Sequence, residues 1–304
     1  MIPFQSNRPT KAVIAAAGFG TRFLPQTKAM PKEMLPIIDK PIIQYVVEDL
    51  VAAGIRDIII VTGYSKRSIE DHFDVPNEDL LANLRAAGES KVHLAHNIEA
   101  IANLANFIYV RQKGPYGNAT PMMCARHLIG DEPFIYTYAD DLIVPNRFEK
   151  MAELYEEHAG CILPCIEIDK DDEFDRYGVL GVKQRPDGMF KMTQIAEKPG
   201  REKAPSNLAS VGGYLFTPDI FEYLDRVKCE LDYSKEFMLQ PALQLMIDEG
   251  KSAYAMPLKD GRYFDTGNKL DYLKTSVQFA LSRSDMAGHF REFLEDLICK
   301  KDGN

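Results

Sequence analysis

Ala15-Ala16-Ala17-Gly18-Phe19-Gly20-Thr21-Arg22, continuing to Pro31-Lys32-Glu33, is the stretch around which the rest of the chain is organised. It follows Lys11-Ala12-Val13-Ile14, a β-prone apolar run that predicts a buried first strand. Glycines directly after a strand let backbone N–H groups turn toward a ligand without a Cβ in the way, and a run of such groups makes a concave anion site. Arg22 and Lys32 add two positive charges. We therefore expect this loop to bind a phosphate chain.

Two other phosphate-binding motifs do not match this sequence, and their absence narrows the kinds of phosphate ligand that the loop would bind. A dinucleotide fingerprint needs a third glycine where Phe23 stands, and an acid at the end of the second strand. The apparent second strand, Asp57–Val61, ends instead in Thr62-Gly63-Tyr64. A Walker loop would need Gly-Lys-Ser/Thr after its glycine-rich start, and none follows here. A nicotinamide oxidoreductase is therefore disfavoured, although a bare Gly-x-Gly is also compatible with an ordinary tight turn.

Composition excludes several other classes of protein. The 304 residues carry a net charge of −9, with 45% hydrophobic and 27% charged residues, which is typical of a globular protein with a full core. The negative charge argues against nucleic-acid binding, so anionic substrates must be captured by a local cluster of positive groups. Met1–Thr10 has no apolar run and no stretch approaches membrane-spanning length, so we expect no signal peptide and no membrane association. Five irregularly spaced cysteines indicate reduced thiols and a cytoplasmic location.

Strand and helix patterns alternate along the first half of the chain, which predicts an α/β fold. Lys91–Leu104 is ambiguous between helix and loop. Two strands end in polar residues: Phe107–Val110 leads into Gln112, and Phe134–Tyr138 leads into Asp140-Asp141. The carboxyl ends of parallel strands face the ligand crevice. Paired acids there can hold Mg²⁺, although Asp-Asp is also a common helix N-cap.

The second half adds antiparallel structure and a helical tail. Strand Cys161–Ile168 precedes a charge run, Asp169–Glu173, that we expect to be a solvated loop. Alternating strands on either side of Pro186-Asp187-Gly188 predict a hairpin. The predicted fold is therefore Rossmann-like α/β: a mixed, mainly parallel sheet flanked by helices, with an antiparallel hairpin insertion and a C-terminal helical tail of two amphipathic helices. We expect a catalytic domain over 1–267 and the tail over 268–304.

The string AAGFGTRFLPQTKAMPKEMLP, Ala16 to Pro36, resembles the signature of the sugar-1-phosphate nucleotidylyltransferases, most closely those that join UTP to glucose 1-phosphate. Further similar strings in the family's order extend the resemblance over nearly the whole chain: Ile37–Pro41, Glu197–Pro199, Pro205–Ala209, Val211–Tyr214 and Tyr263–Asn268. The resemblance implies a Mg²⁺-dependent transferase that makes UDP-glucose and pyrophosphate. A related enzyme that uses dTTP or CTP, and a non-catalytic nucleotide-sugar binding protein, are the alternatives.

The resemblance also implies a role for individual residues. The nucleotide would be bound by Ala16, Ala17, Gly18, Gly20, Thr21, Arg22, Lys32, Gln112 and Gly117. The sugar phosphate would be bound by Tyr177, Gly178, Glu197, Lys198 and Val211. Asp140 and Asp265 would hold the metal, and Arg22, Lys32 and Lys198 would be catalytic because they offset the charge of the reacting phosphates. The carboxamide of Gln112 suits a pyrimidine edge, since both offer a donor and an acceptor.

Two stretches depart from the family's pattern. Tyr116–Thr120 reads Tyr-Gly-Asn-Ala-Thr where the family usually has Gly-Leu-Gly-His-Ala. On the strength of the whole-chain resemblance we still expect UTP to be preferred, with measurable use of dTTP. Lys235–Ala242 stands where the family usually has Glu-(Ile/Leu)-Gln-Leu-Thr-Asp. We expect a helix there that lacks the usual sugar contacts. Members of this family are usually oligomeric, so the tail predicts a homo-oligomer, either a dimer or a tetramer.

Overall fold

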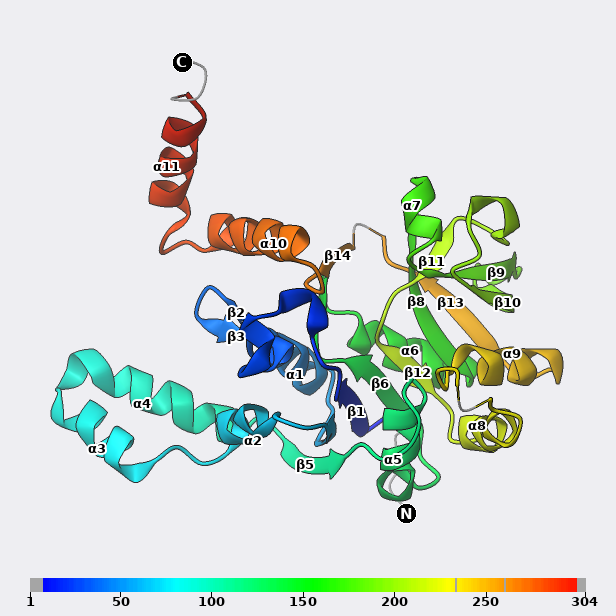
Figure 1. Cartoon of the computed structure of the whole chain (residues 1–304), viewed down its shortest axis with the longest axis horizontal. Helices are drawn as coiled ribbons and strands as arrows, with labels where there is room; N and C mark the ends of the chain where they lie inside the picture. Colours follow the sequence, from blue (N-terminus) through cyan, green and yellow to red (C-terminus); the bar gives the residue numbers. More distant parts are fainter. Residues whose placement is uncertain (1–7, 233, 260, 300–304) are drawn as a thin grey trace.

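A ten-stranded sheet forms the centre of the molecule (Figure 1). The computed structural model of the chain describes residues 8–232, 234–259 and 261–299. Within this part the strand order is β11-β9-β10-β13-β8-β12-β6-β1-β4-β5. The bounds are β1 Lys11–Ala16, β4 Asp57–Thr62, β5 Asn106–Arg111, β6 Phe134–Tyr138, β8 Cys161–Glu167, β9 Gly178–Gln184, β10 Phe190–Glu197, β11 Leu208–Ser210, β12 Tyr214–Phe216 and β13 Ala253–Pro257.

The sheet is mixed, as the sequence predicts. Strands β6, β1, β4 and β5 pair in parallel, and β8 pairs in parallel with β13. The predicted hairpin is present as antiparallel β9 and β10. Antiparallel pairing extends further than predicted, because β11 and β12 also run against their neighbours. Two small sheets accompany the large one: β2 (Pro36–Ile37) pairs with β3 (Lys40–Pro41), and β7 (Asp141–Val144) pairs with β14 (Arg262–Asp265).

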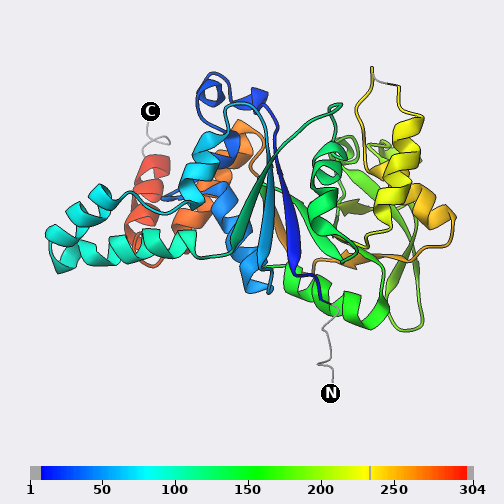
Figure 2. The same ribbon diagram turned by 90° about the horizontal axis from the view of Figure 1, so that it is seen from below.

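Helices cover both faces of the sheet, because alternate residues of each strand point to opposite sides. Val13 of β1 packs in a core with Met122 of α5 (Thr120–Ile129). This core also includes residues of α8 (Ile220–Cys229) and α9 (Gln240–Asp248). Its neighbour Ile14 packs in a second core with Leu50 of α1 (Ile42–Ala52), together with α2 (Arg67–Phe73) and α6 (Phe148–His158). Figure 2 shows α1 and α5 on opposite sides of β1.

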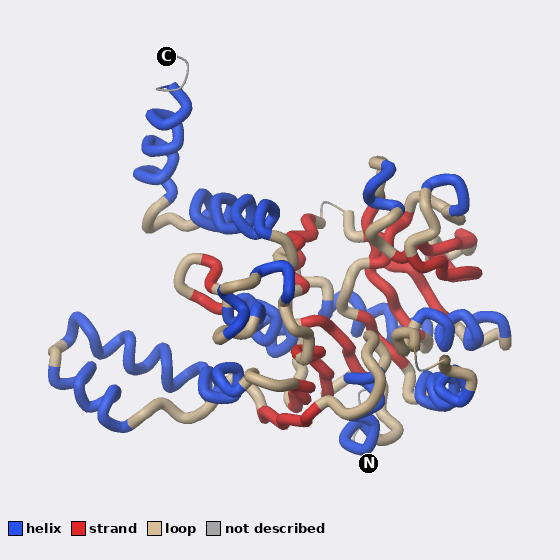
Figure 3. The backbone as a smooth tube through the Cα atoms, in the orientation of Figure 1, coloured by secondary structure: helices blue, strands red, loops and turns tan. Residues whose placement is uncertain are grey.

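The structure resolves one ambiguous stretch and corrects two local expectations. The ambiguous stretch 91–104 belongs to α4 (Glu89–Ala102), which forms a helical hairpin with α3 (Glu78–Ala86) away from the sheet (Figure 3). The charge run 169–173 contains a one-turn helix, α7 (Asp171–Phe174), because buried Phe174 anchors it. Val211–Gly213, within the family-like string Val211–Tyr214, connects β11 to β12. The expected helix over 235–242 begins only at Gln240.

The two tail helices differ in how they contact the rest of the chain. In α10 (Lys269–Ser282), Tyr272 packs edge-on against Phe23 at 5.6 Å between ring centroids, and Phe279 packs against Tyr45 at 5.4 Å. In contrast, α11 (Ala287–Cys299) has no buried residue and extends beyond α10 (Figure 1). Across the described ranges, we find no helix with the length and apolar character that crossing a bilayer requires.

Candidate active site

The predicted site residues gather at one edge of the sheet, where the parallel strands end. The glycine loop follows β1, Gln112 follows β5, and Asp140 lies just after β6. Two cavities, of about 720 and 640 Å³, open along this edge. Five residues line both cavities: Lys32, Asn118, Tyr138, Asp140 and Met238. The two cavities are therefore parts of one cleft that joins beside Lys32 and Asp140.

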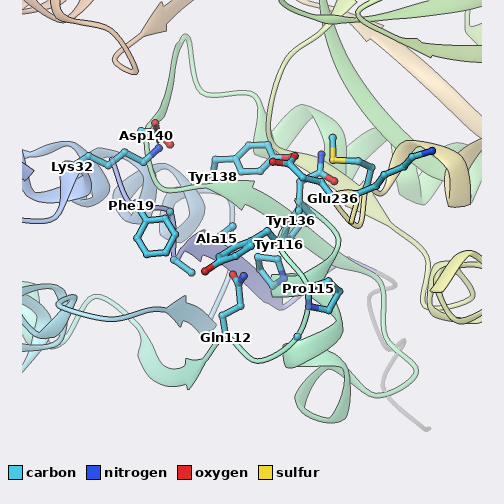
Figure 4. Close-up of a pocket in the computed structure, with 18 of the residues that line it drawn as sticks. Ala15, Phe19, Lys32, Gln112, Pro115, Tyr116, Tyr136, Tyr138, Asp140 and Glu236 are labelled. Atoms are coloured by element: carbon cyan, nitrogen blue, oxygen red, sulfur yellow. Dashed lines mark hydrogen bonds and ion pairs between the residues drawn. The ribbon is translucent and has the colours of Figure 1, made fainter. Parts of the chain in front are cut away.

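The first cavity contains most of the residues predicted to bind the nucleotide. Ala17, Gly18, Lys32, Gln112 and Gly117 all line it. Figure 4 shows Lys32 and Asp140 directed toward each other at one end, with Gln112 at a distance from them. The cavity therefore offers cationic and backbone N–H groups at one end and a carboxamide at the other, as a nucleoside triphosphate requires.

Three of the predicted nucleotide residues do not line either cavity. Ala16 is buried as the last residue of β1, and Thr21 is exposed at the start of a 3-10 turn. Gly20 has a φ of +65°, and its carbonyl accepts a hydrogen bond of 2.7 Å from Thr27 Oγ1. A Cβ at Gly20 would lie 3.2 Å from the Cβ of Lys32. Gly20 therefore shapes the loop and allows close approach of Lys32.

The sequence did not indicate two exposed aromatic residues that line the first cavity. Phe19 is 62% exposed and Tyr116 is 64% exposed, and both line the cavity (Figure 4). Their ring centroids are 5.7 Å apart although they come from different loops. Large exposed aromatic side chains beside a cavity are suited to stack on a base or ribose. The sequence feature that could have indicated these two residues is an aromatic side chain next to a glycine in each loop.

Lys32 and Asp140 form an ion pair at the junction of the two cavities. The distance from Lys32 Nζ to Asp140 Oδ2 is 2.5 Å. Burial by itself raises the pKa of Asp140, but the ammonium of Lys32 outweighs it, so the pKa of Asp140 is lowered. Burial acts on Lys32 in the opposite direction, yet the charge of Asp140 raises the pKa of Lys32. Both groups are therefore charged at neutral pH.

A second ion pair involves Glu33, the residue that follows Lys32. Glu33 Oε2 accepts a hydrogen bond of 2.6 Å from Lys66 Nζ, and the two side chains are only 1% and 5% exposed. Burial raises the pKa of Glu33, although Lys66 acts against it. Removing one member of a buried pair leaves an uncompensated charge and typically costs about 3–5 kcal/mol. This pair therefore fixes the short 3-10 helix Lys32–Met34 that presents Lys32 to the cleft.

The second cavity contains every residue predicted to bind the sugar phosphate: Tyr177, Gly178, Glu197, Lys198 and Val211. Lys198 Nζ lies 3.9 Å from Glu197 Oε1, and Lys198 has a φ of +47°. Arg22 lines this cavity and not the first one; a Cβ at Gly267 would lie 3.1 Å from its guanidinium nitrogen. Arg22 and Lys198 thus supply two cations to the second cavity beside a carboxylate that can accept hydroxyl hydrogen bonds.

The two predicted metal ligands lie in the same cleft although 125 residues separate them in the chain. Asp265 ends β14, and the hydroxyl of the next residue, Thr266, donates to the backbone carbonyl of Asp140 at 2.9 Å. Asp265 Oδ2 pairs with Arg176, a residue that the sequence did not indicate. Across the described ranges no group of three or more His, Cys, Asp or Glu residues could hold a metal. Two carboxylates nevertheless fit Mg²⁺, which takes only one or two protein carboxylates and completes its shell with phosphate oxygens and water.

Asp141 has a different environment from Asp140. Its Oδ1 accepts a hydrogen bond of 3.1 Å from Tyr263, and a Cβ at Gly212 would overlap its other oxygen. Burial, together with the charge of Asp140, raises the pKa of Asp141 to about 7. Of the Asp-Asp pair, Asp140 is therefore the one whose carboxylate stays charged at neutral pH, as a hard-cation ligand must.

The segment 235–239 contributes to the site in a way that the sequence did not predict. It lines the first cavity outside any helix or strand, beside the loop that contains Gly117. Gln240, the first residue of α9, donates a hydrogen bond of 2.9 Å to Glu197 Oε2. Gln240 therefore contacts a residue that is predicted to bind the sugar, a contact that the sequence did not indicate.

Comparison with known proteins shows which proteins this chain resembles. The family described as "Nucleotidyl transferase" matches residues 11–281. The chain is 42% identical to UTP–glucose-1-phosphate uridylyltransferase of Bacillus subtilis, over 96% of this chain and 98% of that protein. It resembles the structure of a UTP-bound UGPase from Acinetobacter baumannii with a TM-score of 0.85 and 33% identity, over 95% of this chain and 99% of that one. A UDP-glucose pyrophosphorylase complexed with UDP-glucose matches with a TM-score of 0.78 and 37% identity, over 90% and 100% of the two chains.

Proposed function

The chain belongs to the nucleotidyl transferase family, and from this premise we propose that it transfers the uridylyl group of UTP to α-D-glucose 1-phosphate. The names of its relatives, and the UTP and UDP-glucose bound in similar structures, support these substrates. The observation that carries the proposal is the single cleft: a cavity lined by the glycine loop and Gln112 joins a cavity lined by Glu197 and Lys198.

The proposed reaction is an in-line displacement at the α-phosphorus of UTP. An oxygen of the sugar phosphate forms a bond to that phosphorus, the bond to the bridging oxygen breaks, and pyrophosphate leaves with the electron pair. A phosphate monoester has its second pKa near 6, so the nucleophile is already largely a dianion at neutral pH and needs no general base. The chemical problem is the approach of two anions. Arg22, Lys32 and Lys198 would offset this repulsion and orient the reactants.

We assign Mg²⁺ to Asp140 and Asp265, which lie in one cleft and carry the hard oxygen ligands that this ion prefers. When bound, the ion would neutralise phosphate charge. In the structure Lys32 pairs with Asp140 and Arg176 pairs with Asp265. Both carboxylates are therefore neutralised before substrate binds, and Lys32 could exchange Asp140 for a phosphate oxygen of the nucleotide.

We assign the base to the end of the first cavity that holds Gln112 and Tyr116. The amide of Gln112 can pair with uracil or, after a flip, with cytosine, so it does not by itself decide between them. Thymine differs from uracil by one methyl group, usually worth no more than about 1–3 kcal/mol in a pocket. UTP is proposed as the preferred nucleotide because the relatives are named for it, with measurable use of dTTP. Purine nucleotides should be poor substrates because their rings are larger than a pocket built for one ring.

The test is release of pyrophosphate when purified protein is mixed with glucose 1-phosphate, Mg²⁺ and each of UTP, CTP, ATP, GTP and dTTP at equal concentration. We expect UTP to give the fastest release and UDP-glucose as the second product. A clear preference for CTP or a purine nucleotide would show that the altered loop at Tyr116–Thr120 has changed the specificity. No pyrophosphate with any nucleotide would favour a non-catalytic binding protein.

We further propose that residues 268–304 form a helical tail that follows the catalytic domain 1–267, and that the chain makes a homo-oligomer through this tail. Three apolar residues on α11 support this: Phe293, Leu297 and Ile298 are 57%, 49% and 64% exposed. Phe293→Glu combined with Leu297→Glu should reduce the mass measured by light scattering to that of a monomer. An unchanged mass would exclude this face as the interface.

The cysteines are all free thiols, which supports the proposed cytoplasmic location.

A further inference from the structure

The loop after Gln112 is joined by hydrogen bonds to the segment that precedes α9. The N–H of Phe237 donates to the carbonyl of Tyr116 at 2.6 Å, and the N–H of Ala119 donates to the carbonyl of Phe237 at 3.0 Å. The side chain of Asn118 adds a third bond, because its Oδ1 accepts from the N–H of Leu239 at 2.8 Å. The base side of the cleft and the start of α9 therefore form one connected unit.

This unit continues into the second cavity through two side-chain amides. Asn118 Nδ2 donates to Gln240 Oε1 at 3.3 Å, and Gln240 Nε2 donates to Glu197 Oε2 at 2.9 Å. The donor-to-acceptor direction of this row of hydrogen bonds is fixed at both ends, because a backbone N–H can only donate and a carboxylate can only accept. The N–H of Leu239 requires the oxygen of Asn118, which turns the NH₂ of Asn118 toward Gln240. The NH₂ of Gln240 must then face Glu197, so neither amide can flip without losing two hydrogen bonds.

The geometry also separates the two oxygens of Glu197. Oε2 is occupied by Gln240, which is 9% exposed, whereas Oε1 lies on the side of Lys198 at 3.9 Å. A Cβ at Gly178 would lie 3.1 Å from Oε2, so glycine at this position leaves room for the bonded arrangement. One oxygen of Glu197 is thus used for orientation and the other is left for a ligand.

We propose that Asn118 and Gln240 are positioning residues that orient Glu197 toward the sugar and connect it to the loop beside the base. The inference rests on the proposed function in assigning the sugar to the second cavity. Its consequence is energetic coupling: a nucleotide that orders the loop at Tyr116–Gly117 also orders Asn118, and through Gln240 it fixes the carboxylate that accepts the sugar hydroxyl. The sugar should therefore contribute less to binding when the link is broken.

The test compares the affinities for UDP-glucose and UDP by titration calorimetry, since their ratio reports the contribution of the sugar. Gln240→Met removes the link without adding a charge. Asn118→Asp replaces the donating NH₂ by a second acceptor, so Gln240 must turn its oxygen toward Glu197. Because hydrogen bonds to charged groups are the stronger ones, each variant should lower the UDP-glucose to UDP ratio roughly tenfold or more.

One variant serves as the control. Gln244→Met changes the same helix one turn later, where Gln244 bonds Ile195 and Asp248 outside the cleft, and should leave the ratio unchanged. Melting temperatures establish that each variant is folded.

The possible outcomes separate this inference from the proposed function. A wild-type ratio near one, or folded Gln240→Met and Asn118→Asp proteins that both keep the wild-type ratio, would overturn the positioning role. An equal loss in Gln244→Met would also overturn it, because the effect would then belong to the helix as a whole. Failure of the wild-type protein to release pyrophosphate from UTP and glucose 1-phosphate would instead count against the proposed function.

Discussion

Substituting Gly117 by alanine should disconnect the base loop from the segment before α9. Gly117 has a φ of +133°, and a Cβ built there would lie 2.1 Å from the carbonyl oxygen of Phe237 and 2.5 Å from its nitrogen. Both contacts are with backbone atoms, so no side-chain rotation can relieve them. Phe237 must move away, which breaks its two hydrogen bonds to Tyr116 and Ala119.

The cost can be worked out from these contacts. Two backbone hydrogen bonds contribute about 0.5–1.5 kcal/mol each. A non-glycine residue at a sparsely populated φ adds about 1–3 kcal/mol of strain. Gly117→Ala should therefore lower the free energy of unfolding by about 2–6 kcal/mol. The KM for UTP should rise as well, because the same loop borders the first cavity.

Gly114 provides a matched control in the same loop. Its φ is +123°, but a Cβ there would meet only a methyl carbon of Thr120 at an ordinary 3.5 Å. Gly114→Ala therefore carries the backbone strain without the clash. In equilibrium urea denaturation, Gly117→Ala should lose about 1–3 kcal/mol more than Gly114→Ala, which is the value of the two hydrogen bonds. Equal losses in the two variants would show that the contact with Phe237 does not stabilise the fold.

Three further predictions concern activity and assume the proposed function. Asp140→Asn and Asp265→Asn should each lower turnover roughly a hundredfold or more, since loss of a carboxylate from a metal costs several kcal/mol; full activity in excess chelator would contradict the Mg²⁺ assignment. Lys198→Ala should raise the KM for glucose 1-phosphate more than that for UTP, and Lys32→Ala should do the reverse; steady-state kinetics that show identical effects would argue against this division of roles between the two lysines. Tyr116→Ala should raise the KM for UTP roughly tenfold, because stacking on an aromatic ring contributes about 1–3 kcal/mol per base, whereas Tyr116→Phe should retain the wild-type KM.

The sequence predicted the elements whose pattern is set locally. Strand β1 and its glycine loop could be predicted because an apolar run followed by glycines has few alternatives. The hairpin at Pro186–Gly188 could be predicted because alternating strands flank a turn. The position of Asp140 followed from a general rule, since parallel strands present their carboxyl ends at one edge. These patterns were sufficient to place most of the predicted site residues in one cleft.

Local pattern was insufficient where the rest of the fold determines the backbone conformation. Residues 235–239 resemble the start of a helix, but they lie outside α9 because Phe237 forms backbone hydrogen bonds with Tyr116 and Ala119. Likewise, 91–104 was ambiguous because α4 packs mainly on α3 and buries only Ala95, which leaves a weak apolar stripe. In both cases the deciding partner lies elsewhere in the chain.

The pairings that give the site its geometry were the hardest to predict. Lys66 joins Glu33 across 33 residues, Arg176 joins Asp265 across 89, and Asn118 joins Gln240 across 122. Each of these residues is common in solvated loops and helix ends, so its identity does not indicate its partner. The motif residues supply the charges and hydrogen-bonding groups of the cleft, whereas these distant partners determine where those groups lie. A homologue could therefore keep every motif and still differ in how tightly it orients its sugar, if the residues at 118 and 240 cannot pair.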